Sequence, residues 1–185
     1  MFKLFKSTSG HLLFSAALLS VLLLPCVGCD SGGAHRLSSQ DNGEIGKPTM
    51  VFYNAPPTID HFKFPDSDHA QGEMIAWHAD LDDAEGASAN RVGHCNGTMM
   101  VTRRNEGRGD DREHRMTTIE LDWDGGADSL LVAGSHPYKH GATESDTPIV
   151  RAITGGTGKY MFACGQVIST RLPSGWYRHD IWLKD

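Results

Sequence analysis

The sequence lacks the short motifs that mark common zinc sites and hydrolases. Its ten histidines are dispersed and no HExxH spacing occurs, and the CxxC spacing at residues 26–29 lies in the leader segment, away from any histidine cluster. No GxSxG segment presents a nucleophilic serine at a sharp turn. We therefore expect neither a bound metal nor a cofactor.

A phosphate-binding loop is also missing, although residues 155–159 read GGTGK. The Walker pattern needs a glycine five residues before Gly158, where Ile153 stands, and a Ser or Thr after Lys159, where Tyr160 stands. The segment is therefore not expected to bind a nucleotide.

The chain has no excess of positive charge and no helical periodicity. Its net charge is -6, and removal of Lys3 and Lys6 with a leader segment would bring -6 to -8. A duplex nucleic-acid partner would require the opposite sign. Short apolar runs broken by Gly, Pro, Asn and Asp predict a single all-β domain.

The first 28 residues have the layout of a secretory signal, with two early lysines, an apolar core and small residues before Cys29. The end of this signal, Cys26-Val27-Gly28-Cys29, resembles a bacterial lipobox, although Cys26 replaces the usual Leu. We expect Cys29 to be lipidated, so that a membrane lipoprotein faces the periplasm or the cell exterior. An ordinary cleaved signal and a single membrane anchor are the alternatives. Residues 29–48 are polar and glycine-rich and predict a flexible tether, followed by a domain at 49–185.

Two cysteines remain in that domain, Cys95 and Cys164. In an oxidising compartment they are candidates for one disulfide. Two buried apolar thiols are the other reading. The sequence leaves both open.

Alternation of apolar and polar residues predicts successive strands along the domain. From Gly72 to Leu81, the side chains of Glu73, Ile75, Trp77 and Ala79 share one face. The predicted strands cover residues 49–54, 58–64 (a second strand or a continuation of the first), 72–81, 91–104, 115–123, 129–134, 147–170 (two strands) and 172–183. Within 115–123, the apolar face is predicted to contain Arg115, Thr117, Ile119, Leu121 and Trp123.

Residues 147–170 are predicted to form two strands joined at a glycine corner made of Gly155, Gly156 and Gly158. About eight antiparallel strands in sequence predict a closed barrel, because closure leaves no open edge.

Four segments carry a resemblance to a known family: GEMIAWHADLDD at 72–83, RVGHCNGTMMVT at 91–102, LLVAGSHPY at 130–138 and AITGGTGKYMFACGQV at 152–167. In this order they resemble strands of the allene oxide cyclase and dirigent barrel superfamily. The resemblance implies a closed antiparallel β-barrel, and, because members are often trimers, a homo-oligomer. It also implies that polar interior positions of the family are replaced here by Ala79, Met99 and Cys164.

The predicted interior is mainly apolar. We expect Trp77, Cys95, Met99, Phe162 and Cys164 to line it, with Glu73 and Tyr138 near a mouth, as the residues that bind a ligand. Glu73 is the weak candidate for a catalytic group. Such a lining suits a small hydrophobic or aromatic molecule.

Three functions remain open from the sequence. The barrel binds such a molecule without chemistry, or it acts as an isomerase, cyclase or dirigent-like enzyme that steers a reactive intermediate by confinement. In the third reading the barrel core is filled by its own side chains and the role is structural or partner-binding.

Overall fold

The computed structural model of the chain describes residues 46–62, 71–104 and 111–184. Nine strands and two short 3-10 helices lie within these ranges: β1 (Met50–Asn54), β2 (Thr58–Phe62), β3 (Met74–Asp82), β4 (Arg91–Arg104), β5 (Arg112–Trp123), η1 (Asp124–Gly126), β6 (Asp128–Lys139), β7 (Ile149–Thr157), η2 (Gly158–Tyr160), β8 (Gly165–Arg171) and β9 (Tyr177–Leu183). The predicted signal, the lipid site at Cys29 and most of the predicted tether lie outside the described residues. No helix within the described ranges has the length and apolar character needed to span a bilayer.

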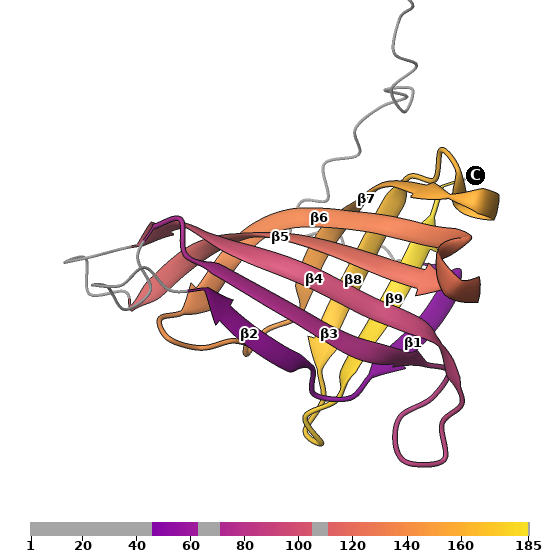
Figure 1. Ribbon diagram of the computed structural model, residues 1–185, viewed down its shortest axis with the longest axis horizontal. Helices are drawn as coiled ribbons and strands as arrows, with labels where there is room; N and C mark the ends of the chain where they lie inside the picture. Colours follow the sequence, from indigo (N-terminus) through magenta and orange to yellow (C-terminus); the bar gives the residue numbers. More distant parts are fainter. Residues whose placement is uncertain (1–45, 63–70, 105–110, 185) are drawn as a thin grey trace, which may run out of the picture. The chain divides into compact units, whose positions relative to one another are not determined.

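The strands form one antiparallel sheet that closes on itself. Each of β3 to β9 pairs with its neighbour in sequence, β9 then pairs with β1, and β1 reaches β3 through Tyr53 and Asp82. Figure 1 shows the long strands β3 to β6 as one curved wall, with β8 and β9 crossing on the other side. The predicted closed barrel is confirmed.

The first two strands share one position in the barrel wall. β2 pairs with residues 74–78 of β3, whereas β1 meets β3 only at its far end, at Asp82. The break between them falls at Pro56 and Pro57, which cannot donate backbone hydrogen bonds to a ladder. Nine strands therefore make eight positions around the barrel.

The alternation of β5 confirms the predicted face. Arg115, Thr117, Ile119, Leu121 and Trp123 are all buried, and the intervening residues are exposed or half-buried. Because successive strand residues point to opposite faces, the buried set lies inside the barrel.

The connection between β7 and β8 contains the helix η2 and begins at Gly158, whereas Gly155 and Gly156, which were also predicted in the corner, pair with β6 inside β7. Gly158 has a φ of 56°, and a Cβ there would collide with Ala127 and Asp128 at the start of β6. The next residue, Lys159, donates its backbone N–H to Asp128 at 3.0 Å, and its ammonium lies 2.8 Å from the same carboxylate. A hydrogen bond and an ion pair to Asp128 therefore hold the corner against the start of β6.

Apolar side chains fill one end of the barrel interior. This filled end contains Leu81, Cys95, Ile119, Leu121, Trp123, Leu130, Val132, Ile153, Val167 and Ile181. The rings of Phe52, on β1, and Tyr160, in η2, both pack against Trp123, each with its centroid 5.2 Å from that of the Trp123 ring. The opposite end of the barrel interior lies near the β6–β7 and β8–β9 loops. It contains polar as well as apolar side chains, and they leave a cavity.

Candidate functional site

A cavity of about 60 Å³ lies in the barrel between the filled end and the loops that follow β6 and β8. One water needs about 10–15 Å³ on the same measure, so the cavity has room for several. The apolar part of its lining consists of Pro57, Ile59, Trp77, Met99, Ile119 and Ile149. The polar part consists of Asn54, Thr117, Tyr138, Thr143, Glu144, Ser145, Thr147, Arg151, Ser169, Arg171, Tyr177 and His179.

The apolar side depends on a large side chain beside a glycine. Trp77 on β3 is the direct cross-strand partner of Gly97 on β4. A Cβ at Gly97 would overlap the Trp77 ring, with the indole Nε1 only 2.7 Å away. The absence of a side chain at Gly97 therefore lets the indole lie flat against the wall beside Met99.

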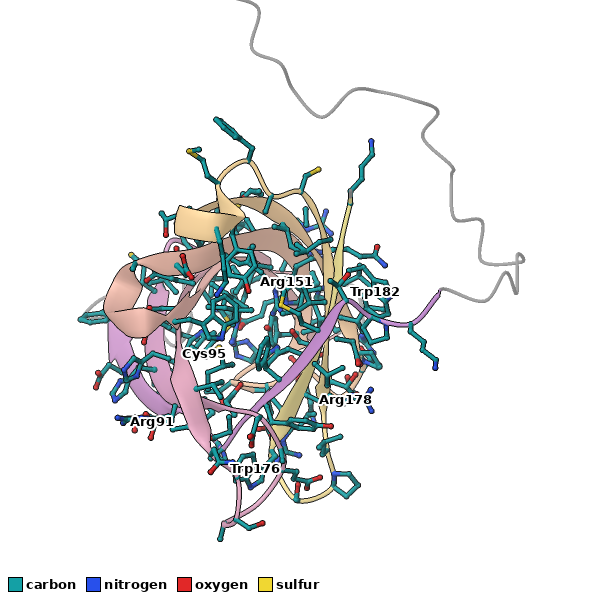
Figure 2. All side chains as sticks on the ribbon, turned by 90° about the vertical axis from the view of Figure 1, so that its right-hand side faces the viewer. Arg91, Cys95, Arg151, Trp176, Arg178 and Trp182 are labelled. Carbon is teal, nitrogen blue, oxygen red and sulfur yellow. The ribbon has the colours of Figure 1, made fainter. Side chains whose placement is uncertain are left out.

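The polar side is built around Arg151 on β7, a guanidinium inside the barrel (Figure 2). Its Nη2 lies 3.2 Å from the Tyr138 hydroxyl and 3.1 Å from His136 Nε2, and its Nη1 donates to Ser169 Oγ at 3.2 Å. Burial lowers the pKa of Arg151, opposed by the nearby Tyr138, but arginine stays protonated in proteins. The cavity therefore borders a permanent positive charge.

The hydrogen bonds from Arg151 continue across the barrel in one direction. Ser169 accepts from Arg151 and donates to His179 Nδ1 at 3.0 Å, and His179 Nε2–H donates to Asn54 Oδ1 at 2.6 Å. Asn54 in turn donates its amide to the carbonyl of Ala55 at 2.7 Å. Because burial keeps His179 neutral and Asn54 Oδ1 can only accept, Nε2 carries the one ring proton and Nδ1 accepts from Ser169.

A second neutral histidine lies on the other side of Arg151. The Tyr138 hydroxyl is 2.9 Å from His136 Nε2, and that nitrogen also faces the Arg151 guanidinium. Burial, and after it the charge of Arg151, lowers the pKa of both His136 and His179 to about 3. Neither histidine carries charge near neutral pH.

An ion pair closes the outer side of the cavity. Glu144, in the loop between β6 and β7, pairs with Arg171 of β8 at 2.8 Å and accepts a hydrogen bond from the Tyr177 hydroxyl at 3.2 Å. Burial, with the neighbouring Glu144, raises the pKa of Tyr177, so the phenol stays protonated. Three elements are thus tied together at the mouth.

A second charged pair supports Tyr138 from behind. Arg115 and Glu113 on β5 form a fully buried ion pair, and the Arg115 guanidinium lies 4.6 Å from the centre of the Tyr138 ring. His140 adds a contact of 3.3 Å to the other oxygen of Glu113. The charge of Arg115 is therefore matched by Glu113.

Three of the residues predicted to bind a ligand meet at the cavity: Trp77, Met99 and Tyr138. Glu73 and Cys95 are buried but do not border it; Cys95 belongs to the filled end, where burial raises the pKa of its thiol to about 12. Ala79, the family position on β3, is half-buried beside Cys95.

The predicted interior position of Phe162 is wrong, and Cys164 does not line the cavity. Phe162 is 85% exposed, because the 3-10 turn η2 interrupts the strand and ends the alternation. Cys164 lies half-buried just before β8 begins. No disulfide joins Cys95 to Cys164 in the structure.

The sequence reasoning missed most of the polar lining, above all Arg151, Ser169 and His179. The buried histidines His136 and His179 were likewise not among the predicted interior residues. The signal was present, because each of these polar residues lies two positions from an apolar residue on the same face of its strand: Ile149 and Ile153 flank Arg151, Val167 precedes Ser169, and Ile181 follows His179. Among the described residues, no cluster of His, Cys, Asp and Glu is arranged to hold a metal ion.

Solved structures with this architecture include enzymes and dirigent proteins. Pyocyanin demethylase matches with a TM-score of 0.54 and 20% identity, over 73% of this chain and 97% of its own. Two pterocarpan synthase dirigent proteins match with TM-scores of 0.53 and 0.51 and identities of 18% and 19%, over 72% of this chain and 84% and 92% of theirs. No protein-family model and no curated protein matches the sequence. The likeness concerns the fold: the chain has the closed antiparallel β-barrel architecture found in pyocyanin demethylase and the two dirigent proteins.

Proposed function

We propose that the barrel binds a small aromatic molecule in the cavity between Trp77 and Arg151. The observation that carries the proposal is the division of the lining into an apolar side with a flat indole and a polar side with fixed hydrogen-bond donors. Such a site orients a ligand that has an apolar body and one polar group. The named activities of the structural neighbours, which concern pyocyanin and pterocarpans, support a ligand of aromatic character.

The size of the site depends on the loop between β6 and β7. A surface hollow of about 510 Å³ lies on the outer side of this loop, and it shares Glu144, Ser145, Thr147 and Arg171 with the 60 Å³ cavity. Typical ligand pockets measure about 300–1,000 Å³, so a displaced loop would join the two spaces into a site of suitable size. The Glu144–Arg171 ion pair is the contact that ligand entry has to break.

The test is direct. Protein purified from its own host is analysed by native mass spectrometry and by organic extraction, with Trp77→Ala alongside the unaltered chain. Trp182→Ala is the matched control, because Trp182 lies outside the barrel and donates to the carbonyl of Gly46 at 2.7 Å. We expect a bound aromatic molecule that is lost in Trp77→Ala and kept in Trp182→Ala. A chain that carries nothing and whose tryptophan fluorescence is unchanged by any aromatic compound tested would refute the proposal.

A second candidate function is catalysis by confinement, as in an isomerase or cyclase. The observation that favours it is the Tyr177–Glu144 pair, in which a protonated phenol and a carboxylate lie together at the cavity. The carboxylate can take a proton from a bound molecule and return it, while the phenol holds the carboxylate in place by its hydrogen bond. Tyr177→Phe and Glu144→Gln are expected to abolish turnover of a bound molecule while it still binds; turnover that survives both changes would leave binding as the function.

We also propose that the mature protein is exported and anchored through lipid on Cys29. The supporting pattern is the basic start, apolar core and CVGC end of the leader. Cells fed a labelled fatty acid should label the unaltered chain and Cys26→Ser but not Cys29→Ser. Label retained in Cys29→Ser would overturn the lipid anchor.

A further inference from the structure

The Arg151 side chain carries a buried positive charge whose hydrogen-bond partners are all neutral. These partners are the Tyr138 hydroxyl, the Ser169 hydroxyl and the uncharged His136 ring. Only 6% of the Arg151 surface is exposed. A charge held away from water is costly unless an opposite charge accompanies it.

The other charges at this end of the barrel are already matched. Glu144 is the one carboxylate that lines the cavity in the described part of the chain, and it pairs with Arg171. Glu113 pairs with Arg115 behind Tyr138. With one carboxylate and two guanidiniums in its lining, the cavity has an excess of one positive charge, and that charge belongs to Arg151.

Three buried hydrogen-bonding groups in this part of the barrel have no partner among the described residues: the Nε–H of Arg151, the hydroxyl of Thr117 and Nδ1 of His136. Arg151 and Thr117 belong to the cavity lining, whereas His136 does not. Thr117, on β5, is 1% exposed, and its side chain belongs to the cavity lining. Buried polar groups are rarely left without a partner, so these two mark where an oxygen-bearing ligand group would be received.

We propose that the ligand of this cavity is an aromatic acid whose carboxylate binds Arg151 and Thr117 while its ring lies against Trp77. This inference rests on the proposed function and specifies the ligand class. The carboxylate supplies the negative charge that the lining lacks and accepts hydrogen bonds that no described residue accepts. The Trp77 and Met99 side accommodates the ring.

The chemistry predicts discrimination between an acid and its neutral amide of the same shape. A hydrogen bond to a charged group contributes more than one to a neutral group, and the difference corresponds to roughly a tenfold to hundredfold change in affinity. The amide keeps the ring contacts with Trp77 but leaves the charge of Arg151 unmatched.

The experiment measures binding of benzoate and 2-naphthoate, and of benzamide and 2-naphthamide, to the purified protein at pH 7 by tryptophan fluorescence and calorimetry. The acids are expected to bind at least about tenfold more tightly than their amides. In Arg151→Gln the preference should vanish while amide binding persists. The matched control is Arg178→Gln, because Arg178 lies outside the barrel and pairs with Asp180 at 2.7 Å; it should keep the full preference.

Each result decides the question. Equal affinity for acid and amide in the unaltered protein, or a preference that survives Arg151→Gln, overturns the anionic ligand and leaves the proposed function standing. Failure of all four compounds to bind counts against both. If Arg151→Gln does not fold, the unaltered protein still gives an answer, because its preference for the acids over the amides tests the anionic ligand without any substitution.

Discussion

The indole ring of Trp77 lies against the backbone of Gly97, its direct partner on the neighbouring strand β4. The contact is so close that no side chain fits at Gly97 without moving the ring. The glycine is therefore a determinant of the cavity wall.

We predict that Gly97→Ala displaces the Trp77 ring and lowers the free energy of unfolding by about 1–3 kcal/mol, the usual cost of overpacking. Urea denaturation measures the stability, and the tryptophan emission maximum reports the new environment of the ring. Gly46→Ala is the control, because a Cβ at Gly46 meets nothing within 4 Å. An unchanged emission spectrum and unchanged stability in Gly97→Ala would contradict the close contact.

The buried ion pair between Glu113 and Arg115 leads to a second prediction. Both side chains are fully buried, so Glu113→Gln leaves the Arg115 charge without its partner inside the barrel. We expect a loss of about 3–5 kcal/mol in unfolding free energy. Asp80→Asn removes one partner of the exposed Arg91–Asp80 pair and should cost less than about 1 kcal/mol. Similar losses of unfolding free energy in the two variants would show that the buried pair stabilises the protein no more than the exposed pair does.

Much of the barrel could be predicted from the sequence because its signal is local. In β5, the alternation from Arg115 to Trp123 alone identifies the interior face, although that face includes an arginine. The glycine corner was equally predictable, since Gly158 adopts a backbone conformation that other residues avoid. These features depend on neighbours within a few residues in the chain.

The polar half of the site could not be predicted in the same way. The hydrogen bond between His179 and Asn54 joins residues 125 positions apart, and Arg151 meets Ser169 only through the pairing of β7 with β8. A charged residue in a strand usually points outward, and only its partners on other strands justify an inward arginine. The sequence suggested an apolar interior because it does not show which residues of other strands will hydrogen-bond to a polar side chain.

The two neutral histidines predict a dependence of stability on pH. In the folded protein, His136 and His179 have pKa values of about 3, whereas an unfolded histidine has the ordinary value of 6.5. The unfolded chain therefore binds more protons between these values, and stability should fall as the pH drops from 6.5 towards 3. Each histidine contributes at most about 1.4 kcal/mol per pH unit in this window.

Urea midpoints at pH 7, 6, 5 and 4 test this dependence. Carboxylates with lowered pKa values, such as Asp83 and Asp128, also lose stabilising contacts in acid, so variants isolate the histidine part. His179→Gln should be less stable at pH 7 but flatter with pH than the unaltered chain. His94→Gln, at a half-exposed position, should keep the full slope. Equal slopes in all three proteins would exclude the buried histidines as the cause.

The backbone at Phe162 gives the last prediction. Phe162 is the single residue other than glycine with a positive φ, 68°, in the described part of the chain, and its ring is 85% exposed. The left-handed conformation costs an ordinary residue about 1–2 kcal/mol, and asparagine tolerates it better. Because so little of the ring is buried, Phe162→Asn should relieve strain without losing packing and raise the unfolding free energy by about 0.5–1 kcal/mol.

The matched control is Met161→Asn. Met161 is also exposed, at 63%, but has an ordinary φ of -55°, so its replacement should change stability by less than about 0.5 kcal/mol. Urea denaturation of both variants at pH 7 gives the comparison. A loss of stability in Phe162→Asn would mean that the ring packs against the barrel. A gain would show that the exposed Phe162 ring is kept at a cost in stability. Residues in strained backbone conformations are found often at functional sites.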